Sequence, residues 1–159
     1  MPGSGKSTIG VVLAKTLMMN FCDTDLLIQQ SQKRSLCQII DDEGLSGFIK
    51  IENKLVSEIS CTNTVVATGG SVILGSDAMA NLKRLGTVIY LKVPLIDLKD
   101  RIKNIKTRGI VMNPGSSLDE VYAERCPLYS KYADICLDCQ NKSLEEIVSL
   151  ISLEMNNTN

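Results

Sequence analysis

The first ten residues, MPGSGKSTIG, constrain the fold of this chain more than any other stretch. They contain most of the phosphate-binding pattern G-x-x-x-x-G-K-[ST]. Gly3 and Gly5 allow a tight turn in which backbone N–H groups converge on an anion. Apolar residues at helical spacing follow over residues 8–17, so a helix N-terminus would point at the same anion. We predict a nucleotide-binding loop, and regard a chance lysine at a glycine- and serine-rich helix start as the weaker interpretation.

The polar side chains of this loop suit nucleotide phosphates. Lys6 can reach the outer phosphates, and the Ser7 hydroxyl can ligate Mg²⁺. The first glycine of the full pattern would stand one residue before Met1, and the strand that normally leads into such a loop is not in the sequence. The predicted phosphate-binding residues are Gly3, Ser4, Gly5, Lys6, Ser7 and Thr8.

Length and charge narrow the class of protein. The chain has 159 residues, enough for one domain with a sizeable core, and we predict a single domain over residues 1–159. Its formal net charge of −1 differs from the basic excess of nucleic-acid-binding or membrane-surface proteins, so we expect neither partner. The sequence shows neither a signal peptide nor a membrane-spanning run, so we expect a cytoplasmic protein, and we expect a monomer.

The chain has no histidine, which excludes Ser-His and Cys-His catalysis. Among its six cysteines, Cys136 and Cys139 form a C-x-x-C pair, but no second pair and no histidine complete a zinc site. We therefore expect reduced thiols that pack as small apolar side chains.

Two acidic residues follow the first predicted helix. Residues 21–25 read as a short strand that ends in Asp23 and Asp25, whose side chains would share one face of the strand. Two carboxylates beside a phosphate site suit a ligand for metal-bound water and a base for a hydroxyl group. The alternative is an aspartate that caps a helix starting near Leu26, which accounts for one of the two but not easily for both.

The rest of the chain alternates between helical and strand-like stretches. Helices are predicted over 26–60 with a break near 41–47, and over 76–85, 95–105, 118–132 and 143–155; strands are predicted over 65–71, 87–93 and 133–138. Pro127 is expected to kink or end its helix, and the tail 156–159 is expected to be disordered. This alternation predicts an α/β fold, a P-loop NTPase-type parallel sheet with helices on both faces.

Two further stretches are candidates for ligand contacts. Gly69 and Gly70 follow a buried strand, where their backbone can approach a ligand closely, although a plain tight turn is an equal alternative. Arg108 lies in a polar loop over 106–117, which we predict to be a mobile lid. A flexible arginine near a P-loop can neutralise a transferring phosphoryl group, and a solvated loop is the competing interpretation.

Together these motifs resemble those of the shikimate kinases, small P-loop kinases. The loop G-S-G-K-S-T, the D-T-D, the A-T-G-G strand end, the loop arginine and the R-x-P-L-Y occur here in the family's order and at similar spacing. The resemblance covers the chain from Met1 to about residue 150. It implies ATP-dependent phosphorylation of the 3-hydroxyl of shikimate, a step toward the aromatic amino acids, with ATP and Mg²⁺ as cofactors.

The resemblance also implies roles on the nucleotide side of the site. Lys6 and the loop amides would hold the ATP phosphates, and Ser7 would bind Mg²⁺. Asp23 would hold the metal through water. Arg108 matches the lid arginine that covers ATP, and Arg101 matches the arginine that packs on adenine.

On the substrate side, the resemblance implies four contacts. Asp25 would grip the shikimate hydroxyls and help to orient or deprotonate the attacking one. Gly69 and Gly70 match the glycines whose backbone lies against the substrate ring. Arg125 matches an arginine that pairs with the substrate carboxylate. This division suits phosphoryl transfer, which depends on positioning and charge neutralisation more than on covalent chemistry.

One substitution falls on an expected substrate contact. The family usually has F-R-x-x-E, whereas this chain has Phe48-Ile49-Lys50-Ile51-Glu52, so Ile49 replaces the second arginine for the carboxylate. Isoleucine cannot make a bidentate bond to a carboxylate, and Lys50 would point about 100° away around the helix. The loss would weaken binding by about 1.5–3 kcal/mol, unless the substrate has changed.

Other departures concern the loops and the sheet. Ser71 replaces the third glycine of the family's G-G-G, and G-I-V follows Arg108 in place of P-L-L. The first strand, which in this fold lies at the centre of the sheet, is missing, so apolar faces and strand edges would be exposed. We therefore expect the natural chain to begin about ten residues before Met1.

Three functions remain open from the sequence. The leading one is phosphorylation of shikimate. The second is a kinase of gluconate or another small polyol or nucleotide, which Ile49 would admit. The third is a degenerate nucleotide-binding or regulatory domain without turnover. ADP release with a panel of acceptors distinguishes them.

Overall fold

The computed structural model describes residues 1–102, 111–112 and 115–157, apart from the side chains of residues 156 and 157. Helices and strands alternate along the chain, so the predicted α/β fold class is confirmed. In order they are α1 (Lys6–Thr16), β1 (Asn20–Asp23), α2 (Thr24–Gln32), α3 (Leu36–Glu58), β2 (Thr64–Ala67), the 3₁₀ turn η1 (Val72–Leu74), α4 (Ser76–Leu85), β3 (Ile89–Lys92), α5 (Leu95–Arg101), α6 (Leu118–Tyr132), β4 (Ile135–Asp138) and α7 (Leu144–Asn157).

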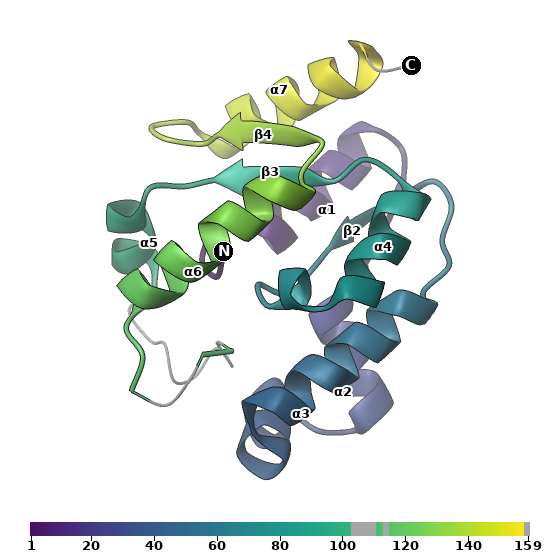
Figure 1. The fold of residues 1–159 in the computed structure, drawn as a ribbon. Helices are drawn as coiled ribbons and strands as arrows, with labels where there is room; N and C mark the ends of the chain where they lie inside the picture. The colour runs from purple at the N-terminus through teal and green to yellow at the C-terminus, as the bar shows by residue number, and fades with distance from the viewer. Residues whose placement is uncertain (103–110, 113–114, 158–159) are drawn as a thin grey trace.

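The strands form two parallel pairs. β1 pairs with β2, with Asn20 opposite Thr64, and β3 pairs with β4, with Ile89 opposite Ile135. Among the described residues no strand joins one pair to the other. Figure 1 shows β3 beside β4 and β2 set apart from them. The predicted sheet is therefore present as two halves, as expected for a chain without the strand that leads into the P-loop.

Helices cover both faces of these strands. α1 packs against β2 and α7, and it buries Ile9, Leu13 and Ala14. Figure 1 shows α6 in front of β3, with α1 behind it. α3 packs along α4. The predicted arrangement, with helices on both faces, is thus confirmed.

The boundary between β1 and α2 differs from the prediction. β1 ends at Asp23, whose carboxylate accepts a hydrogen bond from the Asp25 backbone N–H at 2.9 Å and caps α2. Asp25 therefore lies in the first turn of a helix, so the predicted strand over 21–25 is too long. The alternative interpretation, an aspartate that caps a helix, is correct for Asp23. It does not account for Asp25, whose side chain takes no part in the cap.

Other boundaries are close to those predicted. The break expected near 41–47 is a kink at Gly44, whose φ of 69° lies in the left-handed region. α5 ends at Arg101, earlier than predicted. α6 runs from Leu118 through Pro127 to Tyr132, the bounds predicted for it. Of the two expectations for this proline, a kink or a helix end, the helix end is therefore wrong; burial of Val121, Arg125 and Tyr129 along one face holds the helix. α7 includes residues 156 and 157.

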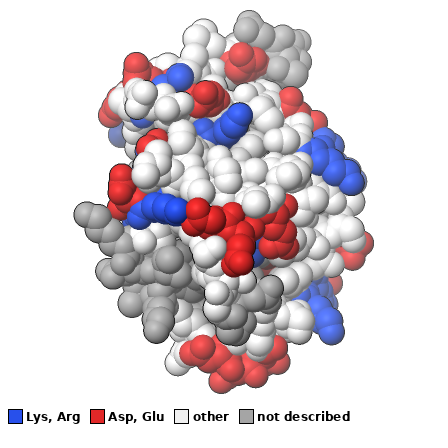
Figure 2. Space-filling view, turned by 60° about the vertical axis from the view of Figure 1, so that its left-hand side comes forward, with Lys and Arg blue, Asp and Glu red and all other residues white. Residues whose placement is uncertain are grey.

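The core has two parts. The larger cluster joins α1, β3, α6 and α7, and includes Leu13, Leu91, Val121 and Ile151. A smaller one lies between α2 and α3. Figure 2 shows acidic side chains gathered in groups on one face, with basic side chains spaced more singly. Among the described residues, no helix is long and apolar enough to cross a membrane.

Candidate active site

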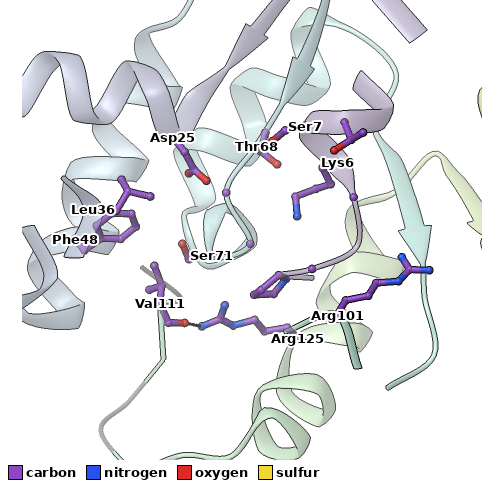
Figure 3. Close-up of a pocket in the computed structure, with 16 residues that line it drawn as sticks. Lys6, Ser7, Asp25, Leu36, Phe48, Thr68, Ser71, Arg101, Val111 and Arg125 are labelled. Carbon is purple, nitrogen blue, oxygen red and sulfur yellow. Dashed lines mark hydrogen bonds between the residues drawn. The ribbon is translucent and has the colours of Figure 1, made fainter. Parts of the chain in front are cut away.

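A cavity of about 600 Å³ lies between the P-loop, the end of β2 and the start of α2 (Figure 3). Its walls combine backbone of glycine turns, charged side chains and an apolar patch. The lining residues are Pro2, Gly3, Gly5, Lys6, Ser7, Thr8, Asp25, Leu36, Phe48, Thr68, Gly69, Gly70, Ser71, Arg101, Val111 and Arg125. Most of the residues predicted from the sequence are therefore brought together.

The P-loop has the backbone geometry that its glycines predict. Gly3 and Gly5 adopt φ angles of 74° and 87°, which other residues rarely adopt. A Cβ on Gly3 would lie 2.7 Å from a side-chain carbon of Ile102. Gly5 precedes α1 without a side-chain cap, so the first N–H groups of the helix remain available for an anion.

Lys6 lies at the bottom of the loop with its ammonium pointing into the cavity (Figure 3). Its Nζ donates to the Met1 carbonyl at 2.7 Å and lies 3.5 Å from the Ser4 hydroxyl. Burial lowers the pKa of this ammonium from its usual value, and nearby carboxylates, led by Asp25, oppose that shift. The lysine is thus a poorly solvated cation that an incoming phosphate would stabilise.

Ser7 and Asp23, the two predicted metal residues, are in contact. The Ser7 hydroxyl donates to Asp23 Oδ2 at 2.6 Å, while Asp23 Oδ1 caps α2. Mg²⁺ prefers oxygen ligands and usually takes only one or two from protein, the others from water and phosphate. A hydroxyl and a carboxylate beside a P-loop fit that preference.

Asp25 points toward the cavity from the first turn of α2 (Figure 3). Burial raises the pKa of its carboxyl, the charge of Asp23 adds to the increase, and Lys6 lowers it. A carboxylate with a raised pKa is a better proton acceptor than an exposed one. The carboxyl of Asp25 therefore lies where it can reach a group bound in the cavity.

Glu52 on α3 is buried behind the glycine turn, 1% exposed. Its Oε2 accepts a hydrogen bond of 2.5 Å from Ser71, and its Oε1 has no partner among the described residues. Burial raises the pKa of this carboxyl to about 7, partly offset by Ser71. A Cβ on Gly69 would lie 2.4 Å from Glu52 Oε1 and 2.8 Å from Asp25 Oδ1, so both carboxylates require glycine there.

Arg125 on α6 is buried, 2% exposed, and reaches the opposite side of the cavity. Its Nη2 donates to the Val111 carbonyl, as the dashed line in Figure 3 marks. Its Nε and Nη1 have no partner among the described residues. Unpaired buried guanidinium donors are costly, so the site is suited to an anionic group that accepts from them.

The glycine turn is tied to its neighbours. The Gly69 N–H donates to the Thr24 hydroxyl at 3.2 Å, and the Gly70 carbonyl accepts from the Tyr129 hydroxyl at 2.5 Å. A Cβ on Gly70 would lie 2.9 Å from Pro2. The turn therefore lies directly against the P-loop, which a plain solvent-exposed turn would not.

The comparisons with known proteins agree with this geometry. A family model described as shikimate kinase matches residues 2–156. This chain belongs to the shikimate kinase family. A shikimate kinase of Rippkaea orientalis is 39% identical over 158 residues, covering 95% of this chain and 82% of the relative. One of Nitrosospira multiformis is 33% identical, covering 98% and 81%.

Solved structures of the family share the fold. A shikimate kinase from Acinetobacter baumannii, in complex with shikimate, matches with a TM-score of 0.87 at 30% identity, covering 98% of this chain and 89% of that one. One from Aquifex aeolicus matches with a TM-score of 0.82 at 31% identity, covering 99% and 94%.

Within the shikimate kinase pattern, Ile49 does not act as a clamp. It is partly buried against the cluster of Ile28, Phe48 and Val111, and it is not among the residues that line the cavity. Lys50 is exposed, as its helical position predicts, and also does not line the cavity. Ser71 pairs with Glu52, which is retained without the arginine.

Two predicted nucleotide residues are less well placed. Arg101 lines the cavity, but its guanidinium points away from it in Figure 3. Arg108, and most of the predicted lid over 106–117, lie outside the described residues.

The structure adds residues that the sequence did not identify. Leu36, Phe48 and Val111 form an apolar wall, and Thr68 lines the cavity near Ser7. Nothing in the spacing separates these apolar positions from ordinary core positions. The Ser71–Glu52 pair joins residues 19 positions apart, which no local pattern reveals.

Proposed function

We propose that this chain transfers the γ-phosphoryl group of ATP to the 3-hydroxyl of shikimate. The observation that carries the proposal is the convergence of Lys6, Asp25 and Arg125, from three different elements, on one cavity. They supply a phosphate-binding cation, a base beside the acceptor and donors for a carboxylate. Family membership supplies the identity of the acceptor.

On the nucleotide side, the N–H groups of the P-loop and the start of α1 hold the ATP phosphates. Lys6 exchanges its bond to the Met1 carbonyl for one to phosphate. Ser7 and Asp23 would hold Mg²⁺, which when bound neutralises charge on the phosphates. Arg101 is proposed to pack on adenine and Arg108 to cover the phosphates.

On the acceptor side, Asp25 orients the attacking hydroxyl and takes its proton as the new O–P bond forms and the bond from γ-phosphorus to ADP breaks. Gly69 and Gly70 let the backbone lie against the acceptor ring. The free Nε and Nη1 of Arg125 pair with the substrate carboxylate. With Ile49 in place of a second clamp, Arg125 is proposed to carry this contact without a second arginine.

We propose that the enzyme acts as a cytoplasmic monomer. Sedimentation of the purified protein with and without substrates tests the monomer directly.

The test is ADP release with ATP and Mg²⁺, using shikimate, gluconate and nucleoside monophosphates as acceptors. We expect turnover with shikimate and background release with the others. Turnover with another acceptor alone would contradict the proposal, as would ATP binding without release in every reaction.

A further inference from the structure

Two oppositely charged groups are buried beside the active-site cavity without forming an ion pair. Glu52 on α3 is 1% exposed, and Arg125 on α6 is 2% exposed. Among the described residues, Glu52 Oε1 and the Nε and Nη1 of Arg125 have no hydrogen-bond partner. A buried carboxylate attracts a guanidinium with free donors strongly, because the protein interior screens charge only weakly. Other contacts must therefore hold the two groups apart.

Each of the two groups is bound to a different neighbour. The Ser71 hydroxyl donates to Glu52 Oε2 at 2.5 Å, in a buried hydrogen bond. The Nη2 of Arg125 donates to the Val111 carbonyl (Figure 3). Ser71, Val111 and Arg125 all line the active-site cavity, whereas Glu52 lies behind its wall. The serine therefore binds the carboxylate from the cavity side.

The helix α3 itself offers Glu52 no cation. Ile49, one turn earlier, packs in the apolar cluster with Phe48, and Lys50 is exposed. No ion pair within the described part of the chain involves Glu52. The hydrogen bond from Ser71 is accordingly the contact that fixes this carboxyl group.

Charged groups on three other elements act on the Glu52 carboxyl. They are Asp25 on α2, Arg125 on α6 and Lys6 on α1. The ammonium of Lys6 already donates to a backbone carbonyl at 2.7 Å, whereas Arg125 keeps two donors free. Arg125 is therefore the cation with which a released Glu52 carboxylate would pair.

We propose that Ser71 is a positioning residue that keeps Glu52 away from Arg125, so that the free donors of Arg125 stay available to an anionic group of the substrate. This role rests on the proposed function, in which Arg125 pairs with the carboxylate of the acceptor. Without the Ser71 hydroxyl, Glu52 loses its partner and pairs with the guanidinium. The carboxylate of the acceptor must then displace Glu52 before it binds.

The kinetic test uses three variants, Ser71→Ala, Glu52→Gln and the two combined. Ser71→Ala should raise the KM for shikimate about ten- to a hundredfold, the effect of one charge-assisted hydrogen bond that must first break, with kcat and the KM for ATP little changed. In the Glu52→Gln background the same serine substitution should have almost no effect, because glutamine carries no charge that competes for the guanidinium. Ser60→Ala, at an exposed position, is the matched control and should keep the parental constants.

A second readout does not depend on kinase activity. The protein is produced with glutamate carrying ¹³C at the side-chain carboxyl, and the Glu52 signal is the one missing from Glu52→Gln. In the ligand-free parent protein this signal should titrate with the pKa of about 7 to which burial raises the carboxyl. In Ser71→Ala the pKa should fall by about one unit or more, because pairing with Arg125 stabilises the charged form.

The proposal is overturned if Ser71→Ala keeps the parental KM for shikimate. It is also overturned if the serine substitution raises this KM equally in the Glu52→Gln background, because the hydroxyl would then act on the glycine turn itself. A Glu52 pKa that stays or rises in Ser71→Ala would likewise overturn it, since the carboxyl would not have paired with Arg125. A parent enzyme that does not phosphorylate shikimate refutes the proposed function alone, and the titration then decides the role of Ser71.

Discussion

At the scale of single residues, Asp25 is the side chain on which the proposed chemistry depends most. Asparagine in its place keeps the size but cannot accept the proton. We expect Asp25→Asn to lower kcat about 10²–10⁴-fold with ATP affinity nearly unchanged. The matched control is Asp100→Asn, at an exposed position, which should leave kcat unaltered. An Asp25→Asn enzyme with near-normal kcat would show that Asp25 is not the base that accepts the proton.

We expect Glu52 to make the free energy of unfolding depend on pH. Its folded pKa, about 7, lies above the ordinary 4.5, so the folded state holds a proton that the unfolded state has lost between these values. The contribution of Glu52 to the free energy of unfolding is therefore fully present below about pH 4.5. It is lost as the pH rises from 4.5 through 7, a decrease of up to about 3 kcal/mol.

The measurement is urea unfolding of Glu52→Gln at several values between pH 5 and pH 8. Glutamine can still accept from Ser71 but does not titrate, so we expect a flatter pH profile than in the parent protein. Glu124→Gln, at an exposed site, is the control and should keep the parent's slope. An unchanged slope in Glu52→Gln would show that the carboxyl is not the titrating group.

Gly3 tests the backbone of the P-loop. Alanine there combines a φ of 74° with a Cβ 2.7 Å from Ile102, so we expect Gly3→Ala to cost about 1–3 kcal/mol of stability and to raise the KM for ATP. Gly86→Ala is the control, because no atom lies within 4 Å of its added Cβ and its φ of 172° is extended. Equal melting temperatures for the two variants would show that the P-loop backbone does not require glycine at position 3.

At the scale of elements, α6 is coupled to the glycine turn through one hydrogen bond. Tyr129 donates its hydroxyl to the Gly70 carbonyl, so Tyr129→Phe leaves a part-buried acceptor unpaired. We expect a loss of about 1 kcal/mol of stability and a several-fold higher KM for shikimate, with the KM for ATP less affected. Tyr132→Phe, one turn later on α6, should change neither KM. A Tyr129→Phe enzyme with parental constants would mean that α6 does not position the turn.

Also at this scale, the sequence predicts a feature well when adjacent residues determine it, and less well when tertiary contacts determine it. The P-loop turn and the α1 start are local, so Gly3, Gly5 and the capless helix follow from adjacent residues. The role of Asp23 as a cap was open, since a strand end and a helix start share the same acidic residue. α6 keeps its predicted bounds through Pro127 because tertiary burial of the helix outweighs the local helix-breaking tendency of proline.

At the scale of the whole molecule, two features that the sequence did not reveal depend on contacts between distant segments. The Ser71–Glu52 pair and the bond from Arg125 to Val111 connect different elements. Residues that the family resemblance singles out, among them Lys6, Asp25 and Arg125, nevertheless line one cavity, because its motifs mark strand and helix ends that meet at one edge of the fold.

The most direct test of the account is the identity of the product. The 159-residue protein is incubated with ATP, Mg²⁺ and shikimate, and the products are followed by ³¹P and proton NMR. The account predicts ADP and one new phosphate monoester, with coupling from phosphorus to the proton on carbon 3 of the ring. A phosphate on another carbon, or ADP formed with inorganic phosphate alone, would contradict it.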